Sequence, residues 1–177
     1  MVANATILYY SVTRRNKMKG SKNTNNDRDW TDTETEAWMG LVKAQQLLSR
    51  NVEDELKKKG YPPLNWYDVL WELDRAEDGS LRLNDLGKRV LFDKYNVTRI
   101  VQRLEEEGLV SRTQCPVDGR GIFACITDKG RMLRREMWPV YKETVKKSFF
   151  SKFNKKELKE LKNFIERIQA SGLEETI

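Results

Sequence analysis

Histidine is absent from the chain, and the only two cysteines, Cys115 and Cys125, do not form a C-x-x-C pair. These absences exclude histidine-based acid–base catalysis, a Ser-His-Asp triad and any zinc site that needs histidine. Neither G-x-G-x-x-G nor G-x-x-x-x-G-K-S/T, the two glycine-rich phosphate-binding motifs, occurs in the sequence. We therefore predict that the protein is not an enzyme, with no catalytic residues, no metal site and no cofactor.

Long apolar runs are also lacking. No stretch approaches the roughly 20 apolar residues that a membrane-spanning helix needs. The N-terminus lacks a signal-peptide pattern, because its first apolar run, ILYY at 7–10, is too short and the basic residues come after it. We therefore expect a cytoplasmic protein of one domain, or of one domain and a tail, without a membrane partner.

Positive charge is what the chain has in excess: 33 Lys and Arg against 27 Asp and Glu give a net charge of +6. This excess favours a polyanionic partner only modestly, since many basic proteins bind none. Residues 13–30, TRRNKMKGSKNTNNDRDW, are polar, basic and rich in Asn. We therefore interpret residues 1–30 as a flexible basic arm.

Helical periodicity and turn signals predict the elements that follow the arm. A helix over 33–59 ends at Gly60, and a second helix over 66–76 takes Asn65 as its N-cap. A turn at 77–80 leads into a very short strand at 81–83. Asn84 then caps a third helix that ends at Val90, and a tight connection over 90–92 leads into a fourth helix.

The fourth helix, over 93–107, has two chemically different faces. Asp93 is a suitable N-cap and Gly108 a suitable C′ residue. The i, i+3, i+4, i+7 spacing predicts one buried stripe, made of Val97, Ile100, Val101 and Leu104. The other side carries Lys94, Tyr95, Asn96, Thr98, Arg99, Gln102 and Arg103, with acids only at the far end. Taken alone, this is an ordinary amphipathic surface helix in which Arg103 pairs with Glu107 at i, i+4.

Two predicted strands, 110–115 and 122–127, form a β-hairpin around residues 116–121. If the hairpin pairs about Asp118-Gly119, Cys115 faces Ile122 while Cys125 faces Arg112. The two cysteines are then too far apart for a disulfide within one chain. We interpret Cys125 as a structural strand residue, and whether either cysteine senses redox state stays open.

Two helices complete the predicted order. Thr127 caps a long helix over 128–150, which Pro139 should kink. A last helix begins at Phe153-Asn154, and its apolar stripe consists of Leu158, Leu161, Phe164, Ile165 and Ile168.

In this order, the segments resemble the winged helix-turn-helix of the MarR family of bacterial transcription regulators. The matching segments are LNWYDVLWEL (64–73), LRLNDLGKRV (81–90), DKYNVTRIVQRLEEEGLVSR (93–112), DGR (118–120) and ITDKG (126–130), flanked by MWPVY (137–141) and FNKKELKELKNFIERI (153–168). The resemblance covers roughly residues 34–168. It departs from the family at Gly87, where Ala is usual, and at Gly119, where a basic residue is common.

The resemblance implies a mainly α fold with a small β-hairpin wing, divided into four parts. These are the arm (1–30), an N-terminal dimerisation helix (31–62), a winged helix-turn-helix DNA-binding domain (63–133) and C-terminal dimerisation helices (134–177). In the family the terminal helices of two subunits interlock, which places two recognition helices about 34 Å apart on a pseudo-palindromic operator. Interface candidates are Trp138, Leu158, Leu161, Phe164, Ile165 and Ile168, which could equally be core. The arm is either an inert tail, which we favour, or a DNA contact.

Double-stranded DNA is the partner that this resemblance implies. The outward face of 93–107 would enter the major groove, where Arg99 suits a guanine edge and Asn96 an adenine edge or a phosphate. Arg120 at the hairpin tip suits the minor groove. The family's salt bridge between the positions of Asp118 and Arg112 would brace the wing. The full expected DNA-binding set is Lys88, Arg89, Lys94, Tyr95, Asn96, Thr98, Arg99, Arg103, Arg112, Asp118 and Arg120.

Family members often bind small aromatic anions or react with oxidants. Here the candidate lining of an effector cleft is Trp38, Trp66, Tyr67, Trp71 and Trp138, although aromatic residues at helical spacing are more often plain core. The sequence thus predicts a dimeric, sequence-specific DNA-binding regulator, a repressor more readily than an activator, that responds to a small aromatic or anionic effector or to oxidation. The alternative is a winged-helix protein-interaction module that binds no DNA.

Overall fold

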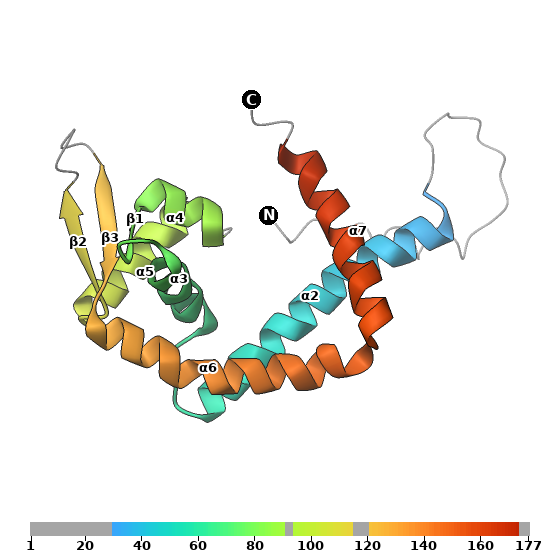
Figure 1. The fold of residues 1–177 in the computed structure, drawn as a ribbon, viewed down its shortest axis with the longest axis horizontal. Helices are drawn as coiled ribbons and strands as arrows, with labels where there is room; N and C mark the ends of the chain where they lie inside the picture. Colours follow the sequence, from blue (N-terminus) through green and yellow to red (C-terminus); the bar gives the residue numbers. More distant parts are fainter. Residues whose placement is uncertain (1–29, 91–93, 115–120, 174–177) are drawn as a thin grey trace, which may run out of the picture. The chain divides into compact units, whose positions relative to one another are not determined.

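The computed structural model describes residues 30–90, 94–114 and 121–173. The chain divides into two compact units, residues 1–38 and residues 39–177. The described elements are α2 (Asp32–Lys58), α3 (Leu64–Arg75), β1 (Ser80–Arg82), α4 (Leu83–Val90), α5 (Lys94–Glu106), β2 (Val110–Gln114), β3 (Ile122–Ile126), α6 (Asp128–Ser148), the 3-10 turn η1 (Phe150–Lys152) and α7 (Lys155–Leu173) (Figure 1). This mainly α architecture with one small sheet confirms the predicted fold class, whereas the four-part division stays a prediction.

Several sequence-based expectations fall outside the described residues. They concern the arm over 1–29, the connection at 91–93 with its proposed cap Asp93, and the hairpin loop at 115–120, which includes Cys115. Within the described part of the chain, no helix is long and apolar enough to span a membrane. The kink expected at Pro139 in α6 stays a prediction.

The start of α3 differs from the prediction that Asn65 is its N-cap. The helix begins at Leu64, directly after Pro63, so Asn65 lies inside the first turn. The free amide of Leu64 is bound by Glu53 of α2, whose Oε2 lies 2.7 Å from the Leu64 nitrogen. A carboxylate from another helix therefore accepts a hydrogen bond from the free N-terminal amide, as a local N-cap side chain would. Asn84 likewise lies inside its helix, because α4 begins at Leu83.

Two later caps follow from side chains that the sequence supplies locally. Thr127 accepts a hydrogen bond at its Oγ1 from the Gly130 amide at 3.1 Å, which confirms the predicted start of α6. Asn154 accepts at its Oδ1 from the amide of Glu157 at 3.0 Å, and Glu157 accepts in return from the Asn154 amide at 2.8 Å. This reciprocal capping box starts α7.

The main core lies between α3, α4, α5 and the sheet. Its buried members are Val69, Leu70, Leu73, Leu81, Leu86, Val97, Ile100, Val101, Leu104, Leu109, Val110, Ala124 and Ile126. The predicted stripe of α5 is confirmed, because all four of its residues are at most 8% exposed. A second cluster joins α2, α3 and α6 through Val52, Leu56, Tyr67 and Met137. Since α3 contributes to both clusters, it links the winged helix to its flanking helices.

The three strands form an antiparallel sheet in the order β1-β3-β2. Val110 pairs with Ile126 and Arg112 with Ala124, so Cys125 lies opposite Ser111. The predicted pairing of Cys125 with Arg112 was wrong by one residue. The physical reason is burial: Val110 and Ile126 must share the core face, and a one-residue slip would turn every side chain of β2 to the other face.

Two glycines allow the turn from α5 into β2 to pack against α6. Gly108 ends α5 with a φ of +69°, a conformation that favours glycine. Gly130, in the first turn of α6, lies against the carbonyl oxygen of Leu109, where a Cβ would come within 2.2 Å of that oxygen. The end of α5, the base of the hairpin and the start of α6 therefore pack closely, and no space is left for a side chain at residue 130.

Truncating the buried stripe should unfold this domain more easily. Leu104→Ala is expected to lower the free energy of unfolding by about 2–5 kcal/mol, because Leu104 is fully buried and a cavity would remain. Urea unfolding followed by circular dichroism measures it. Met132→Ala on α6 is the control, since Met132 is 60% exposed, and it should change stability by about 0.5 kcal/mol or less. Equal losses in the two variants would contradict the packing described.

Candidate nucleic-acid interface

The outward face of α5 forms because its other face is fully committed to the core. With Val97, Val101 and Leu104 buried, the helix turns its polar side chains to the surface. The exposed set comprises Asn96, Thr98, Arg99, Gln102 and Arg103. Lys94 and Tyr95 belong to the first turn of the same helix, but their side chains lie outside the described part of the structure. The sequence therefore predicted this face correctly as far as the structure describes it.

The cations of this face are not neutralised by the acids at the helix end. Among the described residues, neither Arg99 nor Arg103 takes part in an ion pair, so the i, i+4 pair of Arg103 with Glu107 does not form. Glu106 instead accepts a hydrogen bond from Gln102 Nε2 at 3.2 Å. Two guanidinium groups are consequently left available for an anionic partner.

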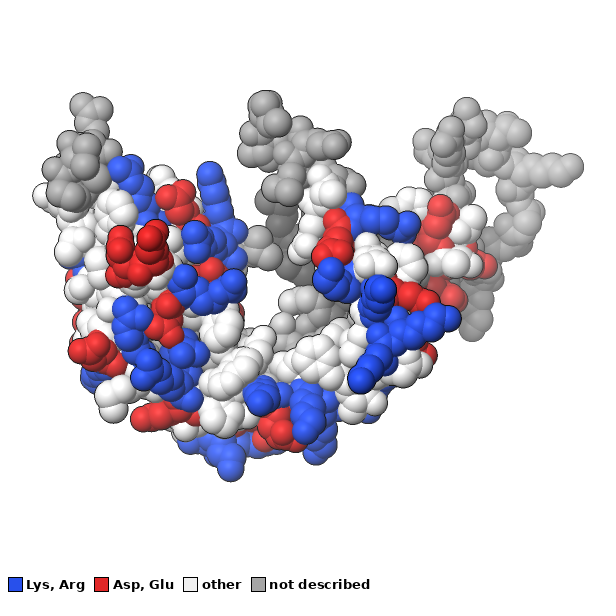
Figure 2. Space-filling view, viewed as in Figure 1, with Lys and Arg blue, Asp and Glu red and all other residues white. Residues whose placement is uncertain are grey.

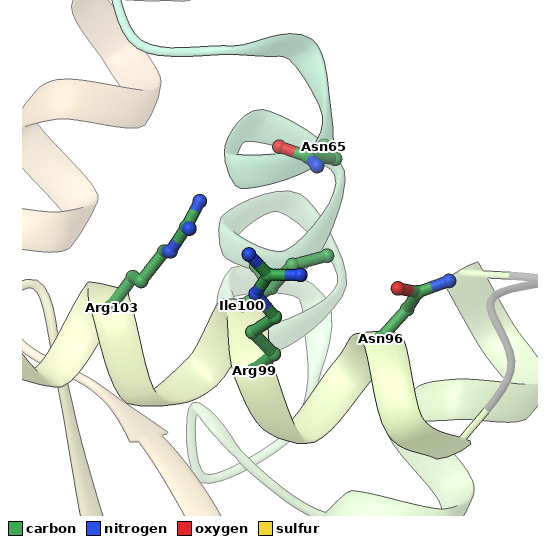
Figure 3. A pocket seen from close by; sticks show the side chains of 5 residues that line it. All are labelled: Asn65, Asn96, Arg99, Ile100 and Arg103. Atoms are coloured by element: carbon green, nitrogen blue, oxygen red, sulfur yellow. The ribbon is translucent and has the colours of Figure 1, made fainter.

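These guanidinium groups also line a pocket of about 310 Å³ between α5 and the start of α3. Figure 3 shows the side chains of Arg99 and Arg103 rising from α5 toward the side where Asn65 lies. Asn96 and Ile100 complete the lining. Within the described residues, the buried Oδ1 of Asn65 has no hydrogen-bond partner. Cationic and amide groups around an apolar floor suit a small anion.

Asn65 is a pocket residue that the sequence did not reveal. Its sequence position indicated a helix cap, and no local pattern relates the start of α3 to the middle of α5. The two segments meet only because α3 packs across α5 in the core.

A second group of cations lies at the end of α4. Lys88 and Arg89 are both exposed there. Arg89 Nη1 lies 3.8 Å from Glu72 Oε2, a long pair whose Arg89 side chain is 48% exposed, and such pairs contribute little to stability. Figure 2 shows Lys and Arg side chains over the α4 side of the winged-helix domain, with acids between them. Both residues keep the exposure that a contact to the DNA backbone requires.

At the base of the hairpin, Arg112 has a partner that the sequence did not reveal. Its guanidinium pairs with Glu105 of α5, at 2.5 Å from Nη2 and 2.6 Å from Nε to Oε2. Hydrogen bonding from Arg112 lowers the pKa of Glu105 below its ordinary value. Asp118 and Arg120 lie outside the described residues, so the salt bridge of Asp118 and the minor-groove role of Arg120 stay predictions. Glu105 was missed because it reads as one of three surface acids in sequence.

Comparison with known proteins now identifies the group to which this winged helix belongs. Residues 59–121 match a model of the MarR family. YkoM of Bacillus subtilis, an uncharacterised HTH-type transcriptional regulator, is 32% identical over 124 residues, which are 68% of this chain and 79% of YkoM. The chain belongs to the MarR family. The members of this family are DNA-binding transcription regulators rather than enzymes.

Two solved structures from Streptomyces coelicolor extend the likeness of this MarR protein to most of its length. AbsC, a MarR family transcriptional regulator, is 30% identical with a TM-score of 0.75, covering 84% of this chain and 99% of AbsC. Sco3205, also a MarR family transcriptional regulator, is 30% identical with a TM-score of 0.74, covering 82% of this chain and 94% of Sco3205. The Sco3205 structure is a complex with DNA.

The aromatic residues proposed for an effector cleft separate into three places in this MarR protein. Tyr67, Trp71 and Trp138 lie together and are joined by Tyr141, which the sequence did not single out. Each of the four rings stacks on two of the others, and the distances between the centroids of stacked rings are 4.9 to 6.0 Å. Trp66 packs against the main core instead, because neighbouring helical residues face different sides. Trp38 contacts Trp30 at 6.5 Å within the 1–38 unit.

Stacking of these four rings on one another favours the interpretation as core over that of an open cleft. A partly buried ion-pair network adjoins them. Asp74 of α3 pairs with both Arg131 and Arg134 of α6, and Arg134 Nε lies 2.7 Å from Asp74 Oδ2. The guanidinium of Arg134 also lies over the ring of Trp71, at 5.4 Å. Rings and ion pairs together hold α6 to α3.

Asp68 lies beside this aromatic cluster in an unfavourable place for a charge. Burial, together with smaller contributions from the carboxylates of Glu53 and Glu72, raises its pKa from 3.8 to about 6. Because the pKa is higher in the folded chain than in the unfolded chain, folding favours the protonated carboxyl over the carboxylate. The contribution of Asp68 to the free energy of unfolding is fully present below the ordinary pKa, and it is lost as the pH rises through 6.

Replacing this carboxyl should therefore stabilise the protein only near neutral pH. Asp68→Asn is expected to raise the free energy of unfolding by about 1–3 kcal/mol at pH 7 and to change it little at pH 4. Urea unfolding at the two pH values measures both. The control, Asp54→Asn, removes an exposed carboxylate from α2 and should show no such pH dependence. An Asp68→Asn effect of equal size at both pH values would refute the raised pKa.

Proposed function

We propose that this MarR protein binds a pseudo-palindromic DNA operator as a homodimer and represses the genes that it controls. The observation that carries the proposal is the exposed face of α5, where Arg99 and Arg103 have no acidic partner among the described residues. A helix fits the major groove of B-DNA, and arginine can bind both acceptors of a guanine edge. The complex of the related Sco3205 with DNA supports the same interpretation.

The DNA contacts that we propose divide into two kinds. Arg99 and Asn96 read base edges, because they lie on the exposed part of α5 near its N-terminus. Lys88 and Arg89 bind phosphates together with Thr98 and Arg103, which gives affinity and salt dependence without sequence choice. We extend the phosphate contacts to Lys94 and Tyr95 and the minor-groove contact to Arg120 on the basis of the sequence alone.

Exposed apolar side chains on the terminal helices support a dimer. On α7, Phe164, Ile165 and Ile168 are 52%, 40% and 63% exposed. On α2, Leu41 and Leu47 are 51% and 57% exposed. Apolar stripes of this kind are typical of surfaces that a second protein covers. A second copy is the partner that a two-fold regulator needs, since each recognition helix then faces one half of a palindromic site.

We further propose that a small aromatic carboxylate acts as the effector by occupying the pocket of Asn65, Asn96, Arg99, Ile100 and Arg103. The carboxylate would bind the two guanidinium groups, and the ring would lie on Ile100. Because the same guanidinium groups face DNA in our proposal, effector and operator would compete directly. The stacked Tyr67, Trp71 and Trp138 are the less favoured location, since those rings already contact one another.

Removing the guanidinium of Arg99 should weaken operator binding without affecting the dimer. Arg99→Ala is expected to cost about 1–3 kcal/mol of binding free energy on the duplex that the wild-type chain selects from a randomised library. Fluorescence anisotropy measures the affinity, and sedimentation measures the dimer. Arg135→Ala, which removes an exposed cation from α6, is the control and should bind nearly as the wild type does.

The same titrations, repeated over a range of salt concentrations, separate the DNA-binding regulator from a protein-interaction module. A regulator that binds phosphates loses affinity linearly with the logarithm of salt concentration. Full-strength binding by Arg99→Ala would refute the assignment of base reading. A wild-type chain that selects no duplex would refute DNA binding itself and leave the interaction module.

Direct competition gives the effector proposal its test. Millimolar benzoate should release the wild-type chain from its operator, whereas benzamide, which has the same ring without the negative charge, should not. Asn65→Phe is expected to fill the pocket and abolish the effect of benzoate, while operator affinity without benzoate stays close to that of the wild type. Release of the Asn65→Phe variant by benzoate at the wild-type concentration would place the effector elsewhere.

A further inference from the structure

The recognition helix and the hairpin are joined by a very short turn. After Glu106, the last residue of α5, β2 begins at Val110. Within the turn, the Gly108 amide donates to the carbonyl oxygen of Glu105 and the Leu109 amide to that of Leu104, both at 2.8 Å. These bonds reverse the chain direction, but they involve the backbone of the turn alone. They leave open what holds the strand beyond the turn against the helix.

Glu105 provides a side-chain connection across this turn. Its Oε2 accepts from Arg112 Nε at 2.6 Å and lies 2.5 Å from Nη2, while its Oε1 accepts from the Arg112 backbone amide at 3.1 Å. One carboxylate therefore binds both the side chain and the main chain of the same strand residue. The two side chains are 34% and 33% exposed, so the pair is partly shielded from water. Charge-assisted hydrogen bonds of this kind are stronger than those between neutral groups.

The hydrogen bond from the Arg112 backbone amide to Glu105 lies on the outer side of β2, away from β3. The strand order β1-β3-β2 places β2 at the edge of the sheet, so its outward amides have no neighbouring strand. Glu105 binds one of these amides, that of Arg112. The neighbouring acids of the helix end do something else: Glu106 accepts from Gln102, and Glu107 accepts from Lys129 through its main-chain oxygen. Among these three acids, Glu105 alone binds the hairpin in the described structure.

We propose that Glu105 and Arg112 form a positioning pair that sets the base of the hairpin relative to the recognition helix, and that Arg112 is not itself a DNA contact. The inference rests on the proposed DNA binding through α5 and the hairpin. Two elements that enter neighbouring grooves of one duplex must keep a defined separation, because holding them in place beforehand removes an ordering cost from binding. Glu105 provides that constraint at the point where the helix passes into the strand.

Whether removal of Glu105 weakens or strengthens DNA binding distinguishes a positioning role from a purely electrostatic one. Removing an acid close to a DNA-binding face should strengthen binding to a polyanion if charge alone mattered. Removing the positioning pair should weaken binding instead, although the protein has lost a negative charge. Glu106 offers a matched control, because it is the next acid of the same helix and makes no bond to β2 in the described structure.

The experiment compares full-length Glu105→Ala and Glu106→Ala on the duplex that the wild-type chain selects from a randomised library. Glu105→Ala is expected to bind that duplex about tenfold more weakly, and Glu106→Ala as well as the wild type or better. On a duplex of unrelated sequence, Glu105→Ala should lose no affinity. Arg112→Lys retains the charge but not the forked geometry, so it should lose affinity as Glu105→Ala does, with an unchanged salt dependence.

A measurement without DNA tests the pair itself. The amide of Arg112 should exchange its hydrogen about tenfold faster in Glu105→Ala than in the wild type or in Glu106→Ala, because it loses its acceptor. Unchanged exchange in Glu105→Ala would overturn the positioning pair whatever the DNA results. If the Arg112 amide exchanges faster in Glu105→Ala but the wild-type chain selects no duplex from the library, the pair exists and the proposed function is refuted. The role of the pair in DNA binding is then refuted with it. Equal operator affinities of the two alanine variants, or an Arg112→Lys variant with full affinity, would overturn the inference.

Discussion

Burial of one apolar stripe on α5 is the constraint on which the rest of the structure depends. Val97, Val101 and Leu104 are almost completely excluded from water, and each contributes on the order of 1.5–3 kcal/mol through that burial. A helix that commits one face to the core has no freedom to rotate about its axis. The polar side chains of the other face are therefore presented in one orientation, which is what recognition of a base edge requires.

The helix α3 connects α5 to the flanking helices α2 and α6, because it packs in both hydrophobic clusters. Leu70 and Leu73 face the main core, while Tyr67 belongs to the cluster shared with α2 and α6. Asp74 adds ion pairs to two arginines of α6. Through these contacts α3 couples α5 to α2 and α6 within the residues that the structure describes.

Periodicity predicted the elements well where the deciding interaction is local or repeats along one helix. The stripe of α5, the Thr127 cap and the glycine that ends α5 all depend on residues within about one helical turn of each other. Predictions were wrong or incomplete where a residue from another segment decides. Asn65 was displaced as a cap by Glu53, Cys125 pairs one residue away from its expected partner, and Trp66 turns away from its neighbour Tyr67.

The amino-acid sequence by itself determined the class of protein: which elements form, which face of α5 stays polar, and which chemistry the missing histidines exclude. These properties follow from residue type and spacing, which are present before the chain folds. Only the tertiary structure decided that Arg112 binds Glu105, and that Asn65 reaches the pocket of Arg99 and Arg103. Those side chains come from segments whose proximity arises when α3, α5 and the sheet bury a common core, and no spacing along the chain encodes it.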